Sequence, residues 1–146
     1  MTDKIEALKD LHTRLIDSRD GYEQSAELAD NSAHKQLFSS QIERRSRNAD
    51  EVRSFLTKNG ETIDDDGSIL AAAHRTWLSL KDTVTTGDDK ILAEIIRGEE
   101  TLLEAYDKAI EVSGAGDPEL KWLTDQYTDL KMLVDDLKGR ATRAAA

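Results

Sequence analysis

The sequence contains no cysteine, one proline and few aromatic residues. Without cysteine the chain can have no disulfide framework, no thiolate metal site and no cysteine nucleophile. It also lacks any apolar run that approaches the length of a bilayer span, and its first residues, MTDKIEALKDLH, lack the apolar segment of a signal peptide. These absences predict a cytoplasmic protein that does not use a membrane as its partner.

Positive charge is scarce relative to negative charge. The 146 residues include 20 Lys and Arg against 30 Asp and Glu, which gives a formal net charge of −10 at pH 7. An acidic surface repels both duplex nucleic acid and anionic membranes, so neither is expected as a partner. The composition is typical of a folded helical protein. The length fits one domain over residues 1–146, with a tail from about residue 141 to 146 that we expect to fray.

Apolar residues at three- and four-residue spacing predict two long helices in the first part of the chain. The first covers about residues 3–30. The second ends near residue 58, before a Lys-Asn-Gly segment, and Asn31 or Ser32 can cap it. A shorter apolar-striped segment follows, SILAAAHRTWLSLKDTV, which Gly87 ends. We expect this segment to be a short crossover helix.

Two further long helices complete the chain. Asp88 can cap the third, and Asp117 followed by Pro118 is the strongest helix start in the sequence. Short loops within each pair of long helices predict two antiparallel hairpins. The connection between the hairpins, about thirty residues, is long enough to run the length of a bundle, so the second and third long helices should be parallel. The predicted fold class is all-α, a four-helix bundle with a short crossover helix between helices two and three.

Three separated segments, RDGYEQSAE, GSILAAAHRTWLSLK and RGEETLLEAYDKA, resemble an uncharacterised bacterial domain family of the ferritin-like superfamily. Its members are small four-helix-bundle proteins without an established activity. The resemblance covers almost the whole chain and implies a ferritin-like bundle. In active members of that superfamily, a carboxylate-rich di-iron or di-manganese site lies between the helices.

A di-metal site of this type needs a glutamate from each of two helices and a Glu-x-x-His motif from each of the other two. Glu23 on the first helix, and Glu99 with Glu100 on the third, can supply the glutamates. The second and fourth helices offer no Glu-x-x-His motif, and His74 lies in the crossover segment. We therefore expect no metal cofactor. A di-iron or di-manganese centre built from these four residues is the alternative.

Arg45 interrupts the apolar stripe of the second helix and should point toward the core or its margin. Its guanidinium group could reach Glu23 or Glu99. A bidentate ion pair would satisfy charges that are otherwise costly to bury. We prefer this buried pair to a metal site and to side chains that extend into solvent.

Gly21 and Gly98 fall inside predicted helices, where glycine costs about 0.5–1 kcal/mol relative to alanine. Close approach of another helix would compensate for this cost. The crossover segment with Trp77 is the candidate neighbour. An exposed and tolerated glycine is the alternative at either position.

The fourth helix carries Trp122, Met132 and Leu133 beside its core stripe. This is more apolar surface than a four-helix core ordinarily covers. Exposed apolar patches mark interaction sites, and two-fold pairing is the commonest way to bury one. We therefore expect these residues to form the interface of a homodimer or of a complex with a protein partner.

The leading hypothesis is a non-enzymatic helical bundle, with a role in stress as one setting, that acts through self-association or a protein partner. No serine and aspartate pair is placed to make His74 a catalytic base, so enzyme activity is not expected. Two alternatives stay open. One is a degenerate ferritin-like metal-binding or oxidative-stress protein, and the other is a bundle that binds a small molecule.

Overall fold

The computed structural model describes residues 2–63, 88–114 and 116–145. All regular secondary structure in these ranges is helical, as the sequence predicts. The elements are α1 (Thr2–Leu28), α2 (Ser32–Lys58), α4 (Asp88–Ser113), the short 3-10 helix η2 (Pro118–Leu120) and α5 (Lys121–Ala145).

Side-chain caps fix two of the helix starts. The Asn31 side chain accepts hydrogen bonds from two backbone N–H groups in the first turn of α2, so it is the N-cap of that helix. The Asp117 side chain accepts from the backbone N–H of Glu119. The first turn after Asp117 is a 3-10 turn, and the α-helix begins only at Lys121.

The last helix continues to Ala145, through the residues where we expected the chain to fray. Residues 141–146 include four alanines. Alanine has the highest intrinsic helix propensity, and the segment contains no glycine or proline that would end the helix.

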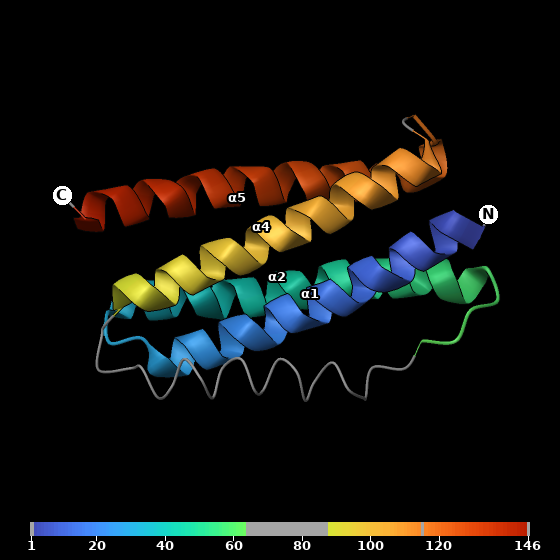
Figure 1. Ribbon diagram of the computed structural model, residues 1–146. Helices are drawn as coiled ribbons and strands as arrows, with labels where there is room; N and C mark the ends of the chain where they lie inside the picture. Colours follow the sequence, from blue (N-terminus) through green and yellow to red (C-terminus); the bar gives the residue numbers. More distant parts are fainter. Residues whose placement is uncertain (1, 64–87, 115, 146) are drawn as a thin grey trace.

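The four long helices form two hairpins (Figure 1). Within each hairpin the helices are antiparallel, α1 with α2 and α4 with α5. The helices α2 and α4 run in the same direction, as the long connection between the hairpins predicts. The expected crossover helix, with His74 and Trp77, lies outside the described residues.

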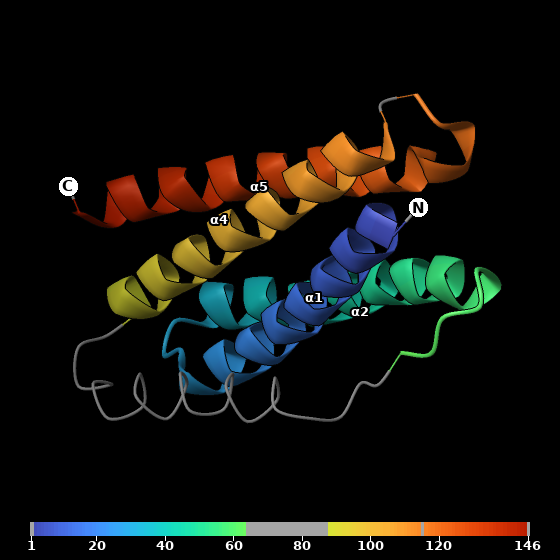
Figure 2. The same cartoon turned by 45° about the vertical axis from the view of Figure 1, so that its right-hand side comes forward.

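The helix α4 lies between α1 and α5 in both views of the ribbon (Figures 1 and 2). It packs against both of them, and α1 packs most extensively against α2. The fourth side of the bundle is different, because α2 and α5 approach each other closely only over a short stretch. The α2 and α5 side is therefore the loosest of these four sides.

Two clusters of buried apolar side chains fill the bundle. On every one of the first three long helices, the larger cluster occupies one end and the smaller cluster the other. The smaller cluster contains Tyr22, Ala29, Phe38, Ile91, Leu92, Ile95 and Leu137, and the larger includes Leu8, Leu11, Leu15, Ala49, Val52, Leu56, Leu102 and Tyr106. Polar side chains lie between the two clusters, halfway along the bundle.

Candidate functional site

The polar side chains at the middle of the bundle occupy one level of three helices. Ser18 on α1, Arg45 on α2 and Glu99 on α4 each stand between residues of the two apolar clusters. Helical spacing turns these positions inward together with their apolar neighbours. The side chains of Arg45 and Glu99 are only 2% and 3% exposed. We call Ser18, Tyr22, Arg45 and Glu99 the charged layer.

Both carboxylate oxygens of Glu99 have partners in this layer. Its Oε2 accepts hydrogen bonds from Arg45 Nη2 at 2.6 Å and from the Tyr22 hydroxyl at 2.9 Å. Its Oε1 accepts from Ser18 Oγ at 2.7 Å. Arg45 Nε donates to Ser18 Oγ at 3.2 Å, so the guanidinium group divides its contacts between Glu99 and Ser18 and does not form the bidentate pair that we expected. Charge-assisted hydrogen bonds of this kind are stronger than hydrogen bonds between neutral groups.

In this layer the Tyr22 hydroxyl and the Arg45 guanidinium group both keep their protons. Burial raises the pKa of Tyr22 well above its ordinary value, and the charge of Glu99 raises it further, while Arg45 opposes both. Burial is the largest single influence and would lower the pKa of Arg45, but Glu99 together with Tyr22 and Tyr106 outweighs it, and the pKa is raised. Tyr22 therefore stays a neutral donor and Arg45 a cation. The Arg45 guanidinium carbon also lies 5.9 Å from the Tyr22 ring centroid, which allows a cation–π contact.

A second polar contact ties α5 to the bundle. The Tyr106 hydroxyl donates to Gln126 Oε1 at 2.6 Å, and Gln126 Nε2 donates to the backbone carbonyl of Asn48 at 3.4 Å. Tyr106 and Gln126 are both buried, and burial raises the pKa of Tyr106 above its ordinary value. These groups are neutral. We call Asn48, Tyr106 and Gln126 the neutral layer.

Glu23 takes no part in the charged layer, contrary to the prediction that it could pair with Arg45 or bind metal. It is exposed. Tyr22 occupies the inward position of α1, and one residue further along a helix turns the side chain by about 100°. Glu23 therefore points away from the core.

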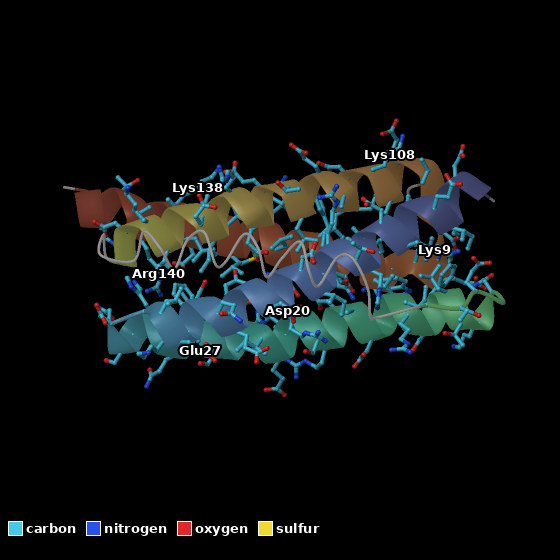
Figure 3. All side chains as sticks on the ribbon, turned by 60° about the horizontal axis from the view of Figure 1, so that its bottom comes forward. Lys9, Asp20, Glu27, Lys108, Lys138 and Arg140 are labelled. Carbon is cyan, nitrogen blue, oxygen red and sulfur yellow. The ribbon has the colours of Figure 1, made fainter. Side chains whose placement is uncertain are left out.

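Glu100 also lies at the surface. It pairs with Lys138 across α4 and α5, with 3.2 Å between the Lys138 Nζ and a carboxylate oxygen, and both side chains are about half exposed. Figure 3 shows Lys138 toward the end of the bundle where the chain terminates. Glu99 and Glu100 thus have different roles, because only Glu99 faces the core.

Gly98 shows no close packing against the residues that the structure describes. It is exposed, and a Cβ atom built there would meet none of their atoms within 4 Å, while its expected neighbour Trp77 lies outside these residues. Gly98 precedes the inward Glu99 and lies on the solvent side of α4. Gly21 is buried, as the packing hypothesis requires, but Trp77, its expected neighbour, lies outside the described residues.

The described residues do not fit a di-metal centre. Residues 2–63, 88–114 and 116–145 contain no group of three or more His, Cys, Asp or Glu side chains that could hold a metal ion. Glu99 is the one fully buried carboxylate in these ranges, and the Arg45 guanidinium group already neutralises it. A ferritin-like site needs several unpaired carboxylates together. The charged layer is therefore suited to a structural role.

Trp122, Met132 and Leu133 do not form the single apolar band that we expected. Trp122 and Leu133 are half-buried, and the Trp122 ring packs on Phe55 of α2 with the ring centroids 6.1 Å apart. Leu133 packs against both core clusters. Met132 is 68% exposed, because it lies about 100° around the helix from Leu133.

A groove of about 670 Å³ opens beside the Phe55 and Trp122 contact, where the end of α2 meets η2 and the start of α5. Aromatic rings and acidic side chains share its wall. The Nζ of Lys4 stands 5.2 Å from the Phe55 ring centroid at this end of the bundle. The groove is lined by Asp50, Glu51, Ser54, Phe55, Lys58, Asn59, Glu119 and Trp122, and we call it the aromatic groove.

The fold and these contacts define a helical-bundle protein whose core is built around a buried, hydrogen-bonded Arg–Glu pair. The chain belongs to the family described as Domain of unknown function (DUF2383), whose profile matches residues 3–112. This agrees with the resemblance to an uncharacterised domain family. The match contains the whole charged layer and stops before α5. Comparisons with curated proteins and with solved structures found no match.

A helix that crosses a membrane needs about 20 mainly apolar residues. Within the described ranges, none of the helices combines sufficient length with sufficient apolar character to do so.

Proposed function

We propose that this protein is a non-enzymatic helical bundle that acts by binding protein, either a second copy of itself or a different chain. The aromatic groove between α2 and the start of α5 is the observation that carries this proposal. Its Phe55 and Trp122 rings are half-buried and pack together, and charged side chains, mostly acidic, line the groove beside them.

This composition is typical of protein interfaces. Their centres are enriched in aromatic residues, which carry much of the binding energy, and their rims are polar. In the groove, Trp122 and Phe55 supply the aromatic surface, while Asp50 and Glu51 supply a polar rim. The groove opens where the end of α2 meets the start of α5, so these side chains are accessible to a partner.

The polar groups of the core support catalysis less well than the groove supports binding. The carboxylate of Glu99 is neutralised by Arg45, and its oxygens also accept hydrogen bonds from Ser18 and Tyr22. A catalytic base or nucleophile needs a reactive group that substrate can reach. The charged layer lies in the interior of the bundle and offers no such group.

We also propose the ferritin-like arrangement and a bacterial, cytoplasmic setting, with stress as one context. The parallel course of α2 and α4 across a long connection supports the ferritin-like arrangement. The resemblance of the three sequence segments supports the bacterial origin. The acidic net charge of −10 supports a partner that is a protein and not nucleic acid.

A site-specific photo-cross-linking amino acid tests the proposal in living cells. It is placed at Ser54, an exposed residue that lines the aromatic groove, in the full chain. Ser39 is the matched control, because it is also an exposed serine of α2 but lies outside the groove. Mass spectrometry identifies each product.

We expect a defined cross-linked protein at Ser54 and none at Ser39. Glu51→Lys should reduce the yield at Ser54, since it reverses a charge on the rim of the groove. The proposal is wrong if Ser54 gives no product, or the same products in the same yield as Ser39.

A further inference from the structure

We infer that the outer face of α5 is a self-association surface on which two copies of this chain pair antiparallel. The inference rests on the proposed function, because it names a second copy as the protein that is bound. It depends on the distribution of charge along α5, on the single exposed apolar side chain at the middle of that helix, and on the aromatic groove at its start.

One face of α5 is marked by a regular spacing of exposed residues. Asp125, Asp129, Met132, Asp136 and Arg143 follow each other at intervals of three, four or seven residues. Residues at these intervals lie on one side of a helix. Arg140 borders this face, since it is four residues beyond Asp136.

Charge changes sign along this face. Its start presents Asp125 and Asp129, whereas Arg140 and Arg143 lie at its far end. Figure 3 shows Arg140 toward the end of the bundle where the chain terminates. The acidic start and the basic end of this face are therefore complementary to each other.

Two ion pairs within α5 compete for these charges, but they are weak. Lys121 contacts Asp125 at 3.2 Å, and Arg140 contacts Asp136 at 2.9 Å, both with four-residue spacing. The side chains are between 35% and 79% exposed. Exposed pairs of this kind contribute little to stability, so they leave the charges available for a partner.

Met132 lies between the acidic and the basic halves. It is 68% exposed and is the one exposed large apolar side chain in the parts of the chain that the structure describes. An antiparallel pair centred next to Met132 brings the two copies of this side chain together near the symmetry axis. Two-fold pairing uses the same surface on both copies, so every favourable contact occurs twice.

In this arrangement, Asp125 faces Arg140 of the second copy, and Trp122 faces Arg143 of the second copy. The latter contact extends into the aromatic groove, where Glu51 and Glu119 also attract a cation. Asp129 faces Asp136 of the second copy, which opposes association. The Arg140 that contacts Asp136 reduces this repulsion. The balance favours a weak dimer.

A charge swap tests the pairing in the full-length chain. Asp125→Lys and Arg140→Glu should each weaken the dimer about tenfold in sedimentation equilibrium, because each places like charges across the axis. The double variant should recover most of this loss. Within one chain, Lys at 125 faces Lys121 and Glu at 140 faces Asp136, so recovery can come only from contact with a second copy.

A single cysteine gives a second measurement, which reports the geometry of the pair by trapping it covalently. The chain has no cysteine, so Met132→Cys creates one thiol that can cross-link only to another copy. A disulfide needs Cα atoms within about 7 Å, which requires position 132 to lie close to the axis. Lys131→Cys is the matched control, since Lys131 is also exposed but points away from this face.

We expect wild-type dimers at tens of micromolar and faster oxidation to dimer for Met132→Cys than for Lys131→Cys. Monomers at all concentrations up to about 100 µM, with equal oxidation of the two cysteine variants, would overturn the inference. Failure of the double charge variant to regain dimer would also overturn the antiparallel pairing. In either case, a different protein cross-linked at Ser54 would leave the proposed function intact, whereas no product at Ser54 would remove the function itself.

Discussion

The two polar layers in the core differ in charge and in the helices that they join. The charged layer connects α1, α2 and α4 through Ser18, Arg45 and Glu99, and it lies wholly within the region that matches the family. The neutral layer connects α4 and α2 to α5 through Gln126, which lies outside that region. Separation of a buried ion pair costs more than loss of a neutral hydrogen bond. The first three long helices are therefore fixed to each other more firmly than α5 is fixed to them.

The largest effect is expected at the charged layer. Arg45→Met leaves the Glu99 carboxylate buried without its cation, so the free energy of unfolding should fall by about 3–5 kcal/mol. Urea denaturation followed by circular dichroism measures the change. Adding Glu99→Gln removes the uncompensated charge and should recover a large part of the loss.

Arg47→Met is the control for this prediction. Arg47 belongs to the same helix, and its ion pair with Glu43 is exposed, with side chains 65% and 77% accessible. Its loss should change stability by less than about 0.5 kcal/mol. Equal effects of Arg45→Met and Arg47→Met would show that Arg45 is solvated in the folded protein.

A smaller effect is expected at the neutral layer. Gln126→Leu leaves the Tyr106 hydroxyl buried without an acceptor and should lower the free energy of unfolding by about 1–3 kcal/mol. Combination with Tyr106→Phe removes the unpaired hydroxyl and should restore stability close to that of Tyr106→Phe alone. The same urea experiment applies. If Gln126→Leu costs as much as Arg45→Met, the two layers hold their helices equally firmly and the contrast between them is wrong.

Asp17 differs from Glu99, because it is a partly buried carboxyl group that no network of hydrogen bonds neutralises. Its Oδ1 has no hydrogen-bond partner among the described residues. Burial, followed by repulsion from Asp20, raises the pKa of Asp17 to about 6, while Arg14 opposes the shift. The folded state therefore binds this proton more tightly than the unfolded chain does. The contribution of Asp17 to stability should increase as pH falls from about 7 toward 4.

Asp17→Asn removes this titration. The variant should be more stable than the wild type at pH 7.5, by less than about 1 kcal/mol because the group is half-exposed and screened. The advantage should decrease below about pH 6 and disappear toward pH 4, near the ordinary pKa of the carboxyl group. Urea midpoints at pH 4, 5, 6 and 7.5 measure it, and a constant difference between the two proteins at all of these values would contradict the raised pKa.

The smallest effect concerns Gly98, which adjoins Glu99 but faces solvent. Gly98→Ala should raise the free energy of unfolding by about 0.5–1 kcal/mol, because alanine favours the helix and its Cβ meets no atom within 4 Å. Gly114→Ala is the contrasting variant, since Gly114 has a φ of +83° that disfavours other residues, and it should be destabilising. Thermal or urea unfolding distinguishes the two. A destabilised Gly98→Ala would indicate close packing on the outer side of the charged layer.

Much of the charged layer could be read from helical periodicity. The apolar stripe of the second helix places Arg45 inward, and the stripe of the third places Glu99 inward, so a buried pair between them is a natural prediction. The choice of Glu99 over Glu23 was not determined by those stripes, since Glu23 lies at the edge of its own. Ser18 was missed, although it is four residues before the inward Tyr22 and so lies on the same face.

The amino-acid sequence by itself determined the helical class, the positions of the four long helices and the inward faces that carry the core. These depend on local periodicity, capping and propensity, which act within a few residues. Only the tertiary structure decided that Glu99 accepts from both Arg45 and Ser18, that Trp122 packs on Phe55, and that Met132 faces solvent. The reason is that the register between helices is set by packing and hydrogen bonds between residues far apart in the chain, and 81 positions separate Ser18 from Glu99.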